Sequence, residues 1–89
     1  MKETELIQAY IDYLTQICRF AQRTIKFHQR MCRLWDDFMQ KERHRPMVNA
    51  VADDFPSWIF FRQQQGIRNV TIRKELCITS INKYIAGRQ

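Results

Sequence analysis

Five cationic side chains recur at helical spacing near the middle of the chain. They are Arg19, Arg23, Lys26, Arg30 and Arg33, separated by 4, 3, 4 and 3 residues. Residues three or four apart share one face of an α-helix, so this spacing predicts a cationic stripe. Like charges at this spacing repel by about 0.2–0.5 kcal/mol per pair on an isolated helix. Because guanidinium groups bind phosphate and guanine edges through paired hydrogen bonds, the stripe favours binding to nucleic acid.

The net charge of +6 is concentrated in two segments of the chain. Residues 1–18 and 46–66 carry −2 and −1, whereas residues 19–45 and 67–89 carry +5 and +4. This distribution indicates a polyanionic partner, first nucleic acid and then an anionic membrane surface. A membrane-bound helix is disfavoured, because the apolar side of the stripe-bearing segment is needed for a core. No apolar run is long enough to span a membrane.

Apolar periodicity predicts an all-α domain of four helices within residues 1–89. The expected helices cover about residues 5–18, 22–41, 53–65 and 69–85. Only two Gly and two Pro are present, which favours long regular elements. Gly66 is placed to end the third helix as its first non-helical residue. The aromatic residues of the third helix are expected to fill a core, and apolar residues surround much of the fourth.

No residue pattern predicts catalysis or metal binding. Cys18, Cys32 and Cys77 form no CxxC pair and suit reduced thiols in a cytoplasmic protein. His28 and Cys32 lie four residues apart and could supply half of a zinc site, but no second pair of ligands follows. Tyr10, Tyr13 and Tyr84 occupy apolar helical positions and are expected in the core. We therefore expect no catalytic residue, no cofactor and no metal in this fragment.

Three helix-entry patterns follow one another along the chain. A small-x-x-Thr turn at residues 21–25 precedes Cys32, Trp35 and Phe38. An apolar-small-acidic entry spans residues 51–55, and a Gly-apolar-x-x-x-Thr-Ile-x-Arg/Lys-x-Leu pattern spans residues 66–76. In this order the patterns resemble the N-terminal core-binding domain of tyrosine recombinases (phage integrases). The resemblance covers about residues 4–85.

The resemblance implies a four-helix, SAM-like bundle that grips double-stranded DNA. In that family the second and fourth helices face the recombination-site duplex, and a separate C-terminal catalytic domain closes a clamp around it. That catalytic domain would lie beyond Gln89, so the fragment is expected to have no strand-transfer activity alone, although the parent protein would cut DNA and could form oligomers on it. The residues expected to contact DNA are Arg19, Arg23, Thr24, Lys26, Arg30, Arg68, Thr71, Arg73 and Lys74.

A helical protein–protein interaction domain of a regulatory protein is the alternative from another class. The broad apolar surface predicted for the fourth helix favours it, because a partner could cover part of that surface. Salt separates the two hypotheses. Binding to DNA weakens steeply as salt rises, whereas packing of apolar surfaces does not.

Overall fold

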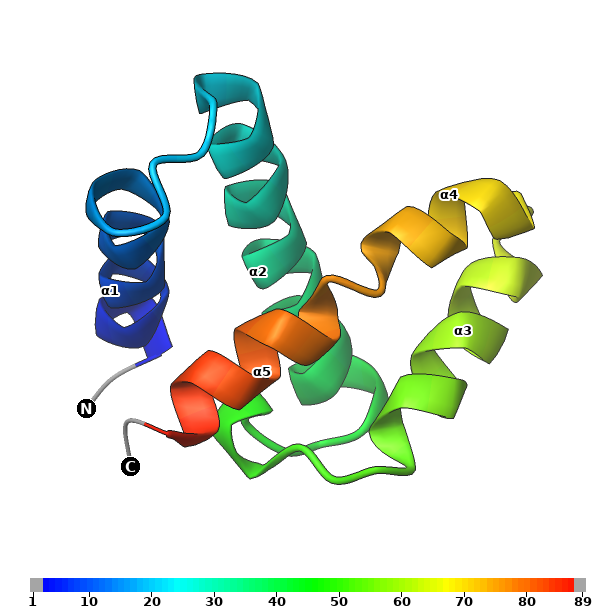
Figure 1. The fold of residues 1–89 in the computed structure, drawn as a ribbon. Coiled ribbons are helices and arrows are strands. Elements are labelled where there is room, and N and C mark those ends of the chain that lie inside the picture. The colour runs from blue at the N-terminus through cyan, green and yellow to red at the C-terminus, as the bar shows by residue number, and fades with distance from the viewer. Residues whose placement is uncertain (1–2, 88–89) are drawn as a thin grey trace.

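The computed structural model describes residues 3–87 of the 89-residue chain, and every regular element among them is helical. The elements are α1 (Glu3–Gln16), α2 (Gln22–Glu42), the short 3-10 helix η1 (Met47–Asn49), α3 (Asp54–Gln64), α4 (Asn69–Glu75) and α5 (Ile78–Ala86). Figure 1 shows α1 beside α2, with α5 crossing them and α3 and α4 paired on the other side. The all-α prediction is thereby confirmed.

The long helix α2 is the element against which most of the bundle packs. α1, α5 and η1 all contact it. Its apolar side is buried, with Met31, Cys32, Trp35 and Met39 fully inaccessible to solvent. Ile78, Ile81 and Ile85 of α5 are buried in the same core. The apolar periodicity of residues 22–41 thus identified both the helix and the face that packs.

Aromatic rings join α3 to the second half of α2. The Trp35 ring stacks on Phe55 with centroids 5.4 Å apart and meets Trp58 edge-on at 5.8 Å. Phe38 lies 5.1 Å from Phe61. The prediction that the third helix supplies aromatic residues to the core is therefore confirmed for these rings. Phe60 is the exception, since 63% of it is exposed.

The ends of three helices use a left-handed backbone. α3 ends at Gln64 and is capped by Gln65, and Gly66 follows with φ of +79°, in the helix-ending role predicted for it. The Gly66 N–H donates to Gln63 O, and the Ile67 N–H donates to Arg62 O, which is the Schellman pattern. Arg19 after α1 and His44 after α2 adopt φ of 53° and 56°. These two residues carry a Cβ that disfavours this region, so both helix ends are strained relative to Gly66.

The helix expected over residues 69–85 is interrupted between α4 and α5, which corrects that prediction. At about 100° per residue, Ile72 and Ile81 would lie about 180° apart on one unbroken helix. The interruption lets Ile72 be buried in α4, which packs on α3, while Ile81 enters the core beside α1 and α2. Thr79 satisfies the freed carbonyl of Leu76, donating its backbone N–H at 3.0 Å and its hydroxyl at 2.8 Å.

The N-terminal region differs from expectation in two details. α1 ends at Gln16 rather than at Cys18, and residues 17–21 form the turn into α2. Tyr10 is buried as predicted, but Tyr13 is 37% exposed and Tyr84 is half-buried. Cys32 is buried and the other two thiols are half-buried, all three without a disulfide. Tyr13 and Tyr84 therefore lie partly at the surface, where α1 meets α5.

Candidate nucleic-acid interface

The cationic stripe lies on the solvent side of α2. Arg23, Lys26, Arg30 and Arg33 are all exposed, and Arg19 is exposed in the turn before the helix. Summed at about 100° per residue, the four positions on α2 lie opposite its buried side chains. Arg19 was expected on the same helical face, and the structure corrects this by placing it before the helix, with φ of 53°. The same helix therefore presents an apolar side to the core and a cationic side to solvent, as its sequence predicted.

None of the five stripe residues forms an ion pair with a side chain in the range 5–87. The carboxylates on α2 lie further along, where Asp37 pairs with Lys41 at 3.1 Å. The guanidinium carbon of Arg30 lies 5.6 Å from the centroid of the Phe27 ring. The ring carries no net charge, so it does not neutralise the arginine. An exposed guanidinium without a carboxylate partner keeps its hydrogen-bond donors for water or for a phosphate.

The second predicted set lies on and just before α4. Arg68, Thr71, Arg73 and Lys74 are exposed, whereas Ile72 and Glu75 are buried. α4 packs on α3, so this set belongs to a different part of the bundle from the stripe. Thr24 is exposed in the first turn of α2. Neither α2 nor α4 has a side-chain cap at its N-terminus, where Ala21 and Arg68 are extended.

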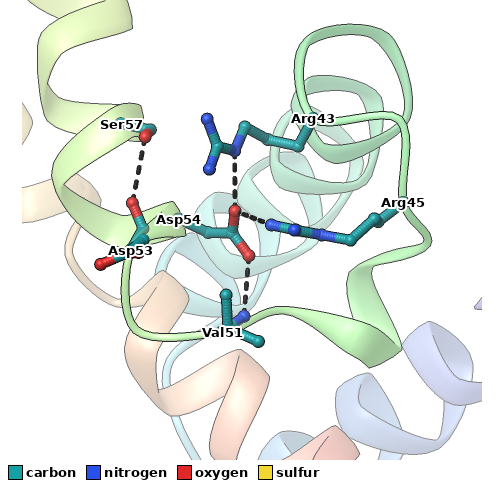
Figure 2. Close-up of polar contacts among 6 residues, drawn as sticks. All are labelled: Arg43, Arg45, Val51, Asp53, Asp54 and Ser57. Atoms are coloured by element: carbon teal, nitrogen blue, oxygen red, sulfur yellow. Dashed lines mark hydrogen bonds and ion pairs between the residues drawn. The ribbon is translucent and has the colours of Figure 1, made fainter.

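Other arginines have structural partners that the sequence did not reveal. The carboxylate of Asp54 is completely buried, and it accepts hydrogen bonds from Arg43, Arg45 and the Val51 N–H (Figure 2). Arg43 Nε lies 2.8 Å from Oδ1, and the Val51 N–H lies 2.7 Å from Oδ2. This cluster fixes the loop between α2 and α3 to the first turn of α3.

The charges around Asp54 determine its titration. Burial by itself would raise the pKa of the carboxyl group. The hydrogen bonds from Val51 and Arg43, with the charges of Arg45 and Arg43, outweigh burial and hold the pKa below its ordinary value. The ionised form is therefore the one that the folded protein stabilises.

Arg62 and Glu75 make a second buried ion pair, between α3 and α4. Arg62 Nε and Nη2 donate to the two carboxylate oxygens at 2.9 and 2.7 Å. The guanidinium also lies 5.4 Å from the Trp58 ring centroid and donates to Gln65 at 2.8 Å. Glu75 is 4% exposed. This paired geometry holds the short helix α4 against α3.

The sequence contained no signal that separated paired from unpaired arginines. In the sequence, Asp54 stands out only as part of the acidic entry at residues 51–55, and α3 begins at that residue. Its partners lie 9 and 11 residues away in a charged loop, and those of Glu75 lie 13 residues away. Helical spacing finds partners three or four residues apart, so it could not find these pairs.

Comparisons with known proteins add no relative to this picture. No protein-family model matches the chain, and no curated protein or solved structure is significantly similar to it. Among the side chains described, those of residues 5–87, no cluster of three or more His, Cys, Asp or Glu could hold a metal ion. None of the helices described has the length and apolar character needed to cross a membrane.

Proposed function

We propose that this chain is a DNA-binding module that grips duplex DNA through the cationic stripe of α2. The observation that carries the proposal is the contrast in pairing. Arg43, Arg45 and Arg62 are held by buried carboxylates, whereas the five stripe residues are exposed and have no carboxylate partner among the residues described. Unpaired cations on one helix face attract a polyanion and release its counterions on binding.

The dimensions of α2 suit a duplex. From Arg23 to Arg33 the helix rises about 15 Å, at about 1.5 Å per residue. Each DNA strand carries one phosphate per about 3.4 Å of helix axis, so this length spans about four phosphates of a strand. A helix with its side chains is about 10–12 Å wide and fits the major groove, which is about 12 Å wide. The stripe can therefore follow a strand or enter a groove.

The resemblance noted in the sequence makes the proposal more specific. A tyrosine recombinase core-binding domain would use α2 together with the residues expected from its fourth helix, which here lie on α4. Arg68, Arg73 and Lys74 are exposed and suit such a second contact. In this role the chain positions a separate catalytic domain on its DNA site, and it cuts no DNA itself.

An NMR titration of the isotope-labelled protein with a short duplex at low salt tests the proposal and maps the surface. We expect amide shifts concentrated on residues 19–33, with a second set on residues 68–74. Both sets should fade as salt is added, because each phosphate contact contributes about 0.9 to the slope of log affinity against log salt. A titration at low salt that leaves residues 19–33 unshifted would contradict DNA binding by the stripe.

One observation favours the alternative, a protein-interaction domain. A groove of about 660 Å³ lies between the end of α2 and α3, and Phe38, Phe60 and Phe61 contribute to its lining. The exposed ring of Phe60 could be covered by a helical partner. Binding at this groove would persist in high salt and would shift Phe60 rather than the stripe, so the same titration with a candidate partner separates the two functions.

A further inference from the structure

A second groove, of about 620 Å³, lies where α1 ends, α2 begins and α5 passes. Five rings contribute to its walls, from Tyr10, Tyr13, Phe20, His28 and Tyr84. Tyr84 lies 5.2 Å from Tyr10 and 5.1 Å from Tyr13, measured between ring centroids. Its volume is within the range of about 300–1,000 Å³ that is usual for ligand pockets.

The rings divide into a closed floor and an open rim. Tyr10 and Leu14 are each only 3% exposed and form the floor. Tyr13 and Phe20 are 37% and 42% exposed, so both present ring surface to solvent at the rim. A planar ring entering the groove could therefore pack on exposed aromatic surface without displacing the core.

Hydrogen bonds hold the inner rings, and Tyr13 at the rim has a side-chain hydrogen bond with Cys18. The Tyr10 hydroxyl bonds to His28 Nδ1 at 2.9 Å, and the Tyr84 hydroxyl donates to Ala9 O at 3.3 Å. Ser80 and Lys83 are exposed at the rim, and no described residue forms an ion pair with Lys83. The lining includes a lysine and no carboxylate, whereas Asp12 of α1 lines an adjoining hollow that shares Tyr13 and Tyr84 with the groove. The groove therefore combines aromatic walls with positive charge.

We infer that this groove holds the base of an unpaired nucleotide in a DNA strand, with Lys83 beside its phosphate. Aromatic rings next to a cation are what single-stranded nucleic acid binds, because every base offers a face for stacking. A duplex cannot fill the groove, since its bases are already stacked. The inference deepens the proposed function by adding a second ligand site, and it rests on that function for the identity of the ligand as nucleic acid.

The position of the groove, beside the start of α2, suits a nucleotide in a strand that leaves the end of a duplex bound to the stripe. His28 lies two residues from both Lys26 and Arg30, about 200° around α2 at about 100° per residue. The groove and the stripe therefore face different sides of α2, and the turn at residues 17–21 joins them. Arg19 and Phe20 are exposed in this turn. A strand that leaves a duplex end at the start of α2 would pass over these two residues and enter the groove.

The test compares a short blunt duplex with the same duplex carrying a single-stranded tail of about four nucleotides. Affinities measured by fluorescence anisotropy should show the tail tightening binding about tenfold, which corresponds to stacking of one base. Phe20→Ala should abolish most of that gain and leave the blunt duplex affinity unchanged. Phe60→Ala removes a more exposed phenylalanine, 63% against 42% for Phe20, from α3 and should keep the gain. Lys83→Glu provides a second rim variant, and it should also abolish the gain.

A chemical readout locates the bound tail independently of affinity. The half-buried thiol of Cys18 lines the groove, so a tail in the groove should slow its alkylation, while the blunt duplex should not. Equal affinity for both DNAs, or a gain that survives in both Phe20→Ala and Lys83→Glu, would overturn the inference and leave duplex binding intact. Protection of Cys18 by a tailed DNA whose blunt form does not bind would instead overturn the proposed function and support the groove.

Discussion

Arginines have different roles in two regions of the molecule, the corner between α2 and α3 and the first half of α2. At the corner, Arg43 and Arg45 surround the buried carboxylate of Asp54 (Figure 2). Along the stripe, Arg23 and Arg30 are exposed, and no carboxylate among the described residues pairs with them. The comparison shows that an arginine's role in this small domain is set by whether the fold brings a carboxylate to it. Removing a partner should therefore cost stability at the corner, whereas removing a stripe cation should cost binding.

The largest effect on stability is expected from Asp54→Asn. This change leaves two guanidinium groups beside a neutral side chain, and breaking a buried ion pair costs about 3–5 kcal/mol. Because Arg43 and Arg45 are partly exposed and can regain water, we expect the lower end, about 3 kcal/mol, from urea denaturation. Asp53→Asn, at the exposed neighbouring position, is the matched control and should change stability by less than about 0.5 kcal/mol. Equal effects of the two changes would contradict the structural role of the corner.

The contribution of Asp54 should also depend on pH in one direction. Its pKa is lower in the folded protein than in the unfolded chain, where an aspartate titrates at about 4. The stabilisation is therefore complete above that unfolded pKa and is lost as pH falls through the lower folded value. Urea midpoints for wild type and Asp54→Asn should differ most near neutral pH and converge in acid. A difference that grows as pH falls would show that the charged carboxylate is not the stabilising form.

The pair between α3 and α4 should show a smaller loss. Glu75→Gln keeps the shape of the side chain but removes the charge that receives two hydrogen bonds from Arg62. Hydrogen bonds to charged groups contribute about 1.5–3 kcal/mol, and Arg62 keeps its contacts with Trp58 and Gln65, so we expect a loss of about 2 kcal/mol. Amide hydrogen exchange should accelerate most in α4, the helix that the ion pair of Arg62 and Glu75 holds against α3. Unchanged protection there would place the stabilising role elsewhere.

Arg19 provides a test in which stability and binding move in opposite directions. Its φ of 53° disfavours any residue with a Cβ, so Arg19→Gly should stabilise the fold by about 0.5 kcal/mol after the entropy cost of glycine. Arg30→Gly, in the interior of α2, should instead destabilise by about 1 kcal/mol. Thermal unfolding of both variants gives the signs, and weaker duplex binding by the more stable Arg19→Gly would show that the strained arginine serves binding. A destabilised Arg19→Gly would contradict this view of the turn.

Local patterns predicted the parts of the fold that depend on neighbours in sequence. The extent of α2, its buried side and the end of α3 at Gly66 all follow from helical period and backbone preference. The interruption between α4 and α5 did not, because no Gly or Pro marks it and two packing directions impose it. The same limit applies to the candidate interface. Spacing predicted the stripe, whereas the ion pairs of Asp54 and Glu75 depend on how distant segments meet.

The measurement that tests the central claim most directly separates the placement of charge from its amount. Two double variants each lower the net charge of +6 by two at exposed positions. One combines Arg23→Gln with Arg30→Gln on the stripe, and the other combines Gln16→Glu with Gln64→Glu away from it. Stripe variants should change stability by only a few tenths of a kcal/mol, through relieved repulsion. If the stripe binds DNA, only the double variant of Arg23 and Arg30 should weaken duplex affinity strongly, by about 2 kcal/mol or roughly 30-fold. Only this variant should also reduce the slope of log affinity against log salt by about 2. An equal and small loss in both double variants would show that net charge alone attracts DNA, and it would contradict a dedicated binding surface on α2.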